Sequence, residues 1–166
     1  MVAVRIAFQV VACWLKIRQY LPAMPESARP VKPAWVSVTF AAGCLYLLIG
    51  LVSADLAGGA PGPRQRFWRG MAWLLSAIVF GIQVARDRIR MRYSAASTAF
   101  HAALGAALGA LGLAIAATIH GYMVSTSHLR AIKLALLIWP VMTAIPAFFV
   151  AYLAALVIRR NPEVIS

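Results

Sequence analysis

Long apolar runs separated by short polar segments dominate the pattern of hydrophobic and polar positions along the chain. A membrane-spanning helix needs about 20 mostly apolar residues, and four runs meet or approach that length. The links between them are short and carry turn or charge signals, so consecutive spans should be antiparallel neighbours. The pattern predicts an all-α polytopic membrane protein, with a four-helix transmembrane bundle over residues 34–158. The four spans cover residues 34–54, 67–86, 95–119 and 134–158.

The N-terminal segment follows a different pattern, because its uncharged run is too short to span a membrane. Polar side chains recur on one helical face, so residues 1–21 are expected to form an amphipathic helix that lies in the membrane interface. A proline-rich linker should follow over residues 22–33, and a basic tail should close the chain over residues 159–166. Translation from Met24 is an open alternative, since the residues after it would make an ordinary polar cytoplasmic start. The polar face comprises Arg5, Gln9, Lys16 and Gln19.

The chain is strongly basic, with 16 Lys and Arg against 4 Asp and Glu, and its cations cluster beside the apolar runs. This arrangement suits membrane flanks and anionic headgroups, and the lack of a basic motif on a soluble fold argues against nucleic acid as a partner. Eleven cations fall on the side of the two termini and five on the other. Cytoplasmic flanks are enriched in positive charge, so we expect an integral protein of a bacterial inner membrane with both termini in the cytoplasm.

The link between the second and third spans reads RDRIRMR and carries four arginines but a single acid, Asp87. Near an anionic leaflet each cation contributes about 1 kcal/mol of attraction. We therefore expect this loop to contact anionic lipid headgroups, which makes the lipid bilayer the first predicted partner. The alternative is an arginine clamp for a phosphorylated ligand, because guanidinium groups bind phosphate in a bidentate way. The expected lipid contacts are Arg86, Arg88, Arg90 and Arg92.

The third span carries a row of residues without large side chains, within the sequence HAALGAALGALGLAIAATIHG of residues 101–121. On a helical wheel the members of this row lie within about 40° of its first glycine. Small residues let a neighbouring backbone approach closely, which is how helices associate in lipid. We expect the row to be a packing groove that faces the alanine-rich side of the fourth span. The row comprises Gly105, Gly109, Gly112 and Ala116.

The third span also places a histidine near each of its ends, at His101 and His120. They are 19 residues apart, or about 28 Å along a helix, so one cofactor cannot bind both. The remaining histidine, His128, follows in the next loop, so one chain cannot supply a pair of axial histidines within the bilayer. We expect no cofactor and interpret His101 and His120 as polar groups near water and headgroups. A haem held by one histidine or by a self-dimer is the alternative.

One group of potential metal ligands is predicted on the outer side of the membrane. Asp55 ends the first span, whereas His120 and His128 flank the loop after the third, which places all three at the same membrane face. A carboxylate with two imidazoles can bind Zn²⁺ or another divalent ion. Nothing in the sequence fixes the distances between these three residues. We therefore expect no metal site and retain the three residues as the candidate ligands if one exists.

The interiors of the four spans carry no charged residue. Ion-coupled transporters usually keep such a residue buried, and intramembrane hydrolysis needs an acid, a metal cluster or an activated nucleophile. Catalysis is therefore disfavoured. The sequence predicts a non-enzymatic subunit, assembly factor or scaffold that contacts another membrane protein or a second copy. Two alternatives are a small oligomeric transporter or channel, and a haem- or quinone-linked membrane anchor.

Overall fold

The computed structural model describes residues 34–58, 62–123 and 129–158, and these form four long helices. Each helix contains a segment long and apolar enough to cross a membrane. The prediction of an all-α four-helix bundle is therefore confirmed, and the apolar helices indicate an integral membrane protein. The helices are α2 (Ala34–Ala57), α3 (Pro63–Ala85), α4 (Ala95–Met123) and α5 (Leu129–Val157).

Three segments named in the sequence analysis lie outside the described residues. They are the predicted interfacial helix over residues 1–21, the linker over residues 22–33 and the basic tail over residues 159–166. The interfacial helix stays a prediction.

The helix ends follow from local sequence chemistry. Gly58 comes directly after α2 with φ 71°, a left-handed conformation that glycine adopts without steric cost. Pro63 begins α3, where its missing N–H would have had no helical partner in any case. Ser94 Oγ accepts a hydrogen bond of 3.1 Å from the backbone N–H of Ser97, which satisfies one free donor in the first turn of α4.

The link after α3 is more helical than the sequence suggests. Arg86–Arg90 continues α3 as a π-helical turn, η3, where a loop was expected. The chain then reverses at Arg92, whose φ of 55° is unusual for a residue other than glycine. The turn stays wound because Asp87 and Arg88 find partners inside the bundle, as described below.

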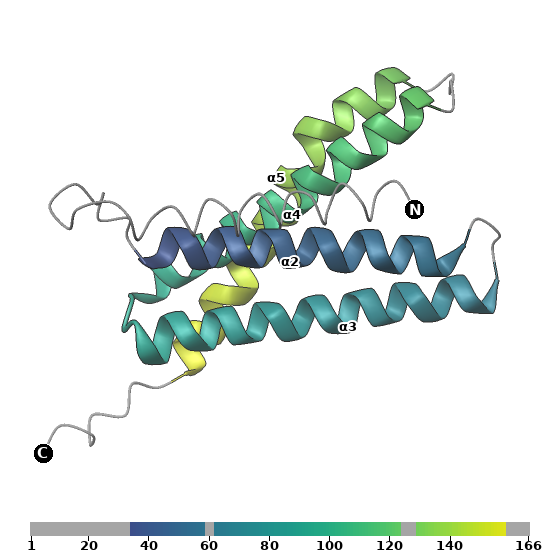
Figure 1. Cartoon of the computed structure of the whole chain (residues 1–166). Coiled ribbons are helices and arrows are strands. Elements are labelled where there is room, and N and C mark those ends of the chain that lie inside the picture. Colours follow the sequence, from purple (N-terminus) through teal and green to yellow (C-terminus); the bar gives the residue numbers. More distant parts are fainter. Residues whose placement is uncertain (1–33, 59–61, 124–128, 159–166) are drawn as a thin grey trace, which may run out of the picture.

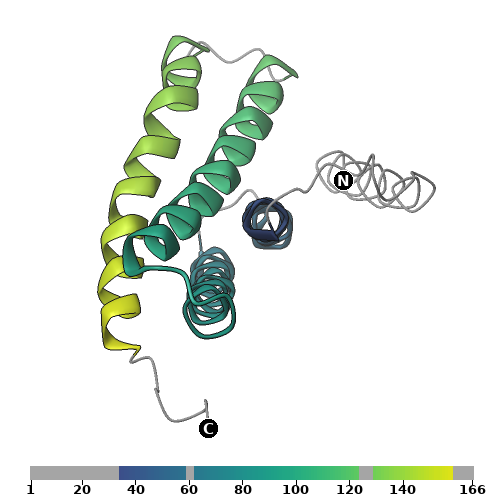
Figure 2. The same cartoon turned by 90° about the vertical axis from the view of Figure 1, so that its left-hand side faces the viewer.

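The helices are arranged as two antiparallel pairs that cross obliquely (Figures 1 and 2). In the view of Figure 1 the hairpin of α4 and α5 passes behind the pair formed by α2 and α3. The two pairs meet at the end where α3 leads into α4 and diverge toward the other end. Helix α4 is central, because it packs extensively against both α5 and α2, whereas α3 packs mainly against α2.

The core contains small side chains, which allow the helices to approach closely. Val84, Ala99, Ala102 and Ala151 form a buried cluster at the end where the pairs meet. Most buried alanines of α4 lie more than about 100° around the helix from its glycine row, so α4 has two separate small-residue faces. Those alanines are Ala99, Ala103, Ala110 and Ala114.

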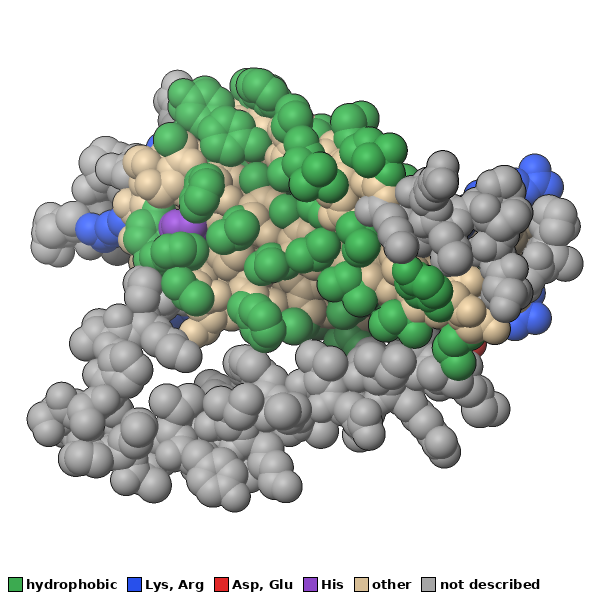
Figure 3. Space-filling view, turned by 90° about the horizontal axis from the view of Figure 1, so that it is seen from above, with side chains coloured by type: hydrophobic (Ala, Val, Ile, Leu, Met, Phe, Trp, Pro, Cys, Tyr) green, Lys and Arg blue, Asp and Glu red, His purple; other side chains and the backbone are tan. Residues whose placement is uncertain are grey.

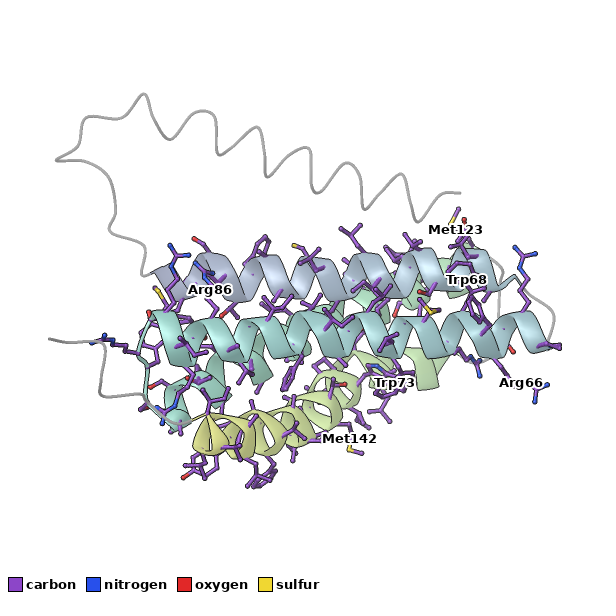
Figure 4. All side chains as sticks on the ribbon, turned by 90° about the horizontal axis from the view of Figure 1, so that it is seen from below. Arg66, Trp68, Trp73, Arg86, Met123 and Met142 are labelled. Atoms are coloured by element: carbon purple, nitrogen blue, oxygen red, sulfur yellow. The ribbon has the colours of Figure 1, made fainter. Side chains whose placement is uncertain are left out.

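The surface has the polarity of a membrane-embedded bundle. Hydrophobic side chains cover the middle of the face in Figure 3, and the basic side chains lie at its two ends. Arg66 and Arg86 mark opposite ends of the long α3–η3 helix (Figure 4). Trp73 lies between them and is 80% exposed, which is unfavourable in water but suits contact with lipid chains.

Candidate functional site

The glycine row of α4 faces α2. A Cβ atom placed at Gly109 would lie 2.5 Å from Cβ of Tyr46 and 3.3 Å from the carbonyl oxygen of Gly43. A Cβ atom at Gly43 would in turn lie 2.8 Å from Cβ of Leu108. The two backbones are therefore so close at this crossing that neither glycine can gain a side chain without a shift of a helix.

The contact continues along both helices. A Cβ atom at Gly112 would lie 3.0 Å from a methyl carbon of Leu47, and one at Gly50 would lie 2.7 Å from a methyl carbon of Leu113. Ala116, the last residue of the row, is half-buried. The sequence analysis expected the fourth span to occupy this groove, but α2 occupies it with two glycines of its own. Their seven-residue spacing, which places them on one helical face, was the available signal.

Gly105 has a different role from the rest of the row. A Cβ atom there would lie 3.2 Å from Oε1 and 3.4 Å from Nε2 of Gln83, and 3.4 Å from the carbonyl oxygen of Thr39. The amide of Gln83 is buried in this space, and its Nε2 donates a hydrogen bond of 3.1 Å to the carbonyl oxygen of His101. The absence of a side chain at Gly105 thus lets a polar group of α3 reach the backbone of α4.

One turn further along α3, a buried acid meets a buried histidine. Oδ2 of Asp87 lies 3.1 Å from Nδ1 of His101, and the two side chains are only 2% and 8% exposed. The π-helical turn brings Asp87 to this position. A carboxylate is costly to bury without a partner, so the imidazole is its principal compensation among the described residues.

Aromatic rings enclose His101. The ring of Trp35 stacks on the imidazole at 4.6 Å between centroids and 3° between planes. The ring of Tyr93 lies 5.0 Å away at 82°, and that of Phe100 lies 6.4 Å away. The expectation that His101 lies near water and headgroups is therefore wrong, because these rings and Asp87 bury it.

Arg88 connects the same region to α5. Its Nε donates a hydrogen bond of 2.9 Å to the carbonyl oxygen of Ala155, and its Nη1 donates one of 2.9 Å to that of Tyr93. The last carbonyls of a helix have no helical donor, so a guanidinium here both satisfies one of them and offsets the negative end of the α5 dipole. We use the name polar junction for the set that joins all four helices: Trp35, Gln83, Asp87, Arg88 and His101.

Several polar atoms in and beside the polar junction are buried without a hydrogen-bond partner among the described residues. They are Oδ1 of Asp87, Oε1 of Gln83 and the hydroxyl groups of Thr39 and Thr98. Asp87 and Thr98 are 1% and 0% exposed. Since buried polar groups are usually paired, this region has more hydrogen-bonding capacity than the described residues use. The hydroxyl group of Thr98 makes no hydrogen bond to His101.

The other predicted site residues are dispersed. Asp55 and His120 lie exposed on α2 and α4, and His128 lies outside the described residues. In the described ranges, no three His, Cys, Asp or Glu side chains are placed to hold a metal ion. Of the four arginines expected to contact lipid, Arg90 and Arg92 are exposed and Arg86 is half-buried, whereas Arg88 points into the bundle.

The sequence analysis missed the pairing of Asp87 with His101, although the signal was present. The predicted threading put the RDRIRMR link and the start of the third span at the same membrane face. A single acid among four arginines, close to a histidine about two turns into the next span, should have suggested a contact. Read as a solvated loop, the link predicts only that Asp87 offsets the charge of one arginine.

Comparison with protein-family models, curated proteins and solved structures finds no match to this chain. The fold and the site therefore define the class on their own. It is a four-helix protein with apolar helices of membrane-spanning length, a glycine contact between α2 and α4, and a buried polar junction at one end.

Proposed function

We propose that this protein is a non-enzymatic membrane component, a small subunit, assembly factor or scaffold, and that it acts through helix–helix contacts. The observation that carries this proposal is the open face of α3. A Cβ atom at Gly70 or Gly81 would have no neighbour within 4 Å among the described residues, in contrast to the filled positions of α2 and α4. Ala77 is exposed between them at helical spacing.

The rest of the same helix supports this proposal. Helix α3 contacts α4 and α5 sparsely, and the helix pairs diverge away from the polar junction (Figure 2). Trp73 and Leu74, which are 80% and 54% exposed, lie beside the small residues. Lipid chains are as apolar as these side chains, so close backbone approach rather than hydrophobicity would select a partner helix. An open row of small residues next to large ones has the shape that such an approach requires.

Site-specific crosslinking in the intact membrane tests the proposal. A photo-crosslinking residue introduced at Ala77 should give a discrete protein adduct, which Gly81→Leu abolishes because its side chain fills the row. The same crosslinker at Ile115, which is 45% exposed on α4, is the matched control for a lipid-facing position. Lipid adducts alone at both positions would refute a role in helix contacts. An adduct of twice the chain's mass would identify the partner as a second copy.

A small oligomeric transporter or channel is the second candidate, and the pair of Asp87 and His101 favours it. The sequence argument against this class was the absence of a charged residue inside the spans, but Asp87 is buried within the helical segment Pro63–Arg90. Buried acids in spans often mark ion pathways. In vesicles containing purified protein and a pH-sensitive dye, this candidate predicts proton or cation flux that Asp87→Asn removes. The leading proposal predicts flux no higher than in empty vesicles.

The haem- or quinone-linked anchor is the third alternative, and the enclosure of His101 argues against it. Trp35 covers one face of the imidazole, the rings of Tyr93 and Phe100 lie against it at steep angles, and the side chain is only 8% exposed. A haem at this histidine would have to displace the surrounding rings. An absorbance spectrum of the purified protein tests this alternative directly.

A further inference from the structure

The polar junction contains a titratable pair that helix contacts alone do not require. Among the described residues, the one hydrogen bond of the Asp87 carboxylate is made to Nδ1 of His101. Arg88 is close in sequence, but its guanidinium bonds to the carbonyl oxygens of Ala155 and Tyr93. The balance of charge at the buried carboxylate therefore depends on whether His101 carries a proton.

Two contacts of His101 involve the imidazole ring directly. The carboxylate of Asp87 attracts a positive charge at 3.1 Å. The parallel stack with Trp35 places that charge over the electron-rich face of an indole, which is the best aromatic partner for a cation. Both contacts are made to the imidazole itself, and both strengthen when it is charged.

The other charged and titratable groups around the pair are few. The π-helical turn contributes Arg86 and Arg88, which oppose a second positive charge, and the link to α4 contributes the phenol of Tyr93. The sequences of α2 from residue 35 to 54 and of α5 from residue 134 to 158 contain no charged residue. The repulsion from Arg88 is reduced because its guanidinium is directed to two carbonyl oxygens.

We propose that the polar junction is a binding site for one exchangeable proton, carried on His101 beside Asp87, and that release of this proton loosens the joint between α3 and α4. The proton leaves through the part of the His101 side chain that the described residues do not cover, which is 8% of its area. Its departure leaves a buried carboxylate facing a neutral ring. A buried ion pair is weakened strongly when one partner loses its charge, so the contact between Asp87 and His101 weakens. The site thus makes the position of α3 sensitive to the local proton concentration, which goes beyond the proposed scaffold function.

The stack of Trp35 on His101 provides the measurement. A protonated imidazole in contact with an indole quenches its fluorescence, so Trp35 should report the charge of the ring. In a protein that keeps Trp35 and carries Phe at the four other tryptophans, emission should be low at acid pH and rise as the proton leaves. An ordinary imidazole titrates near pH 6.5, so a scan from about pH 4 to 9 covers the range. The substitutions are Trp14→Phe, Trp68→Phe, Trp73→Phe and Trp139→Phe.

Matched variants identify the groups responsible. Asp87→Asn keeps the shape but removes the charge, so the midpoint of the fluorescence change should move to lower pH by about one unit or more. His101→Gln should abolish the change. A protein that keeps only Trp73, which is 80% exposed on α3, should show no transition, since no described histidine lies beside it.

Two results would overturn the proposal: a flat titration of the Trp35-only protein, or a midpoint that Asp87→Asn leaves unchanged. If the variants do not fold, NMR of the wild-type junction decides instead. Histidine ring signals in a protein that carries His120→Gln and His128→Gln report the charge of His101 alone. A ring that keeps one charge state across the scan contradicts the exchange of a proton, and one that changes state supports it.

Discussion

The glycine contact between α2 and α4 yields the sharpest prediction, because a single added carbon atom tests it. In Gly109→Ala the new Cβ would lie 2.5 Å from Cβ of Tyr46. That atom is fixed to the backbone of α2 and cannot rotate away, so the two helices must separate. The matched control is Gly81→Ala on α3, where a Cβ atom would have no neighbour within 4 Å in the described part of the chain. Both substitutions occur inside helices and add the same group.

The magnitudes follow from two opposing effects. Alanine is favoured over glycine in a helix interior by about 1 kcal/mol, and this gain applies to both variants. At Gly109 the overpacked contact adds a cost of about 1–3 kcal/mol. We therefore expect Gly81→Ala to be neutral or stabilising and Gly109→Ala to be less stable than it by about 1–3 kcal/mol. Gly109→Leu should be worse still, whereas Leu108→Ala should cost less because it keeps the Cβ atom that meets Gly43.

Thermal unfolding in a mild detergent, followed by circular dichroism, is the assay. For a chain of this size each kcal/mol corresponds to about 2–4 °C in Tm. Gly109→Ala should thus melt below Gly81→Ala by at least about 2 °C. Equal melting temperatures for the two alanine variants would show that α2 does not pack on the glycine row. If Gly109→Leu also left Tm untouched, the row would face lipid.

Three further predictions concern the arginines and the threading. Arg88→Met should lower the unfolding free energy by about 1–3 kcal/mol, because it removes the charged donor at the end of α5, whereas Arg90→Met should have little effect on Tm. Arg90→Gln should weaken binding to anionic vesicles in a flotation assay without a change in Tm, and equal binding would contradict the lipid contact. Reporter fusions at Ser166 and within residues 58–62 should place the C-terminus in the cytoplasm and the link between α2 and α3 outside. The opposite pattern would contradict the charge argument.

The four helices were predictable because span length and hydropathy are properties of contiguous sequence. The antiparallel pairing of α2 with α3 and of α4 with α5 follows from the short links and appears in the structure, whereas α3 and α4, which are also consecutive, contact each other sparsely. The partner of each face was not predictable in the same way. Helix α4 has a glycine side and an alanine side, both of which permit close approach, and a helical wheel cannot tell which neighbour takes which side. Gly43 and Gly50 of α2 decide the matter, and only packing across the helices shows this.

The polar junction was harder to predict for a physical reason. Its geometry depends on a π-helical turn, which rotates Asp87 relative to the regular α-helix before it, and no local sequence rule predicts such turns reliably. Charged residues between apolar runs usually mark solvated links, so Asp87 was assigned with the arginines around it. The same rule predicts a lipid contact for Arg88, although its side chain bonds to a carbonyl oxygen at the end of α5.

The two contacts of the bundle have different consequences for α3. The glycine contact holds α2 against α4 through close backbone approach and not through charged groups. Helix α3 has no such contact with α4, and its hydrogen bonds to the other helix pair come from Gln83, Asp87 and Arg88 near its C-terminal end. A weakened polar junction would therefore leave α2, α4 and α5 in place while α3 stays attached mainly to α2. Helix α3 also bears the open row of small residues. The helix proposed to contact a partner is therefore also the helix whose position depends most on the hydrogen bonds and ion pair of the polar junction.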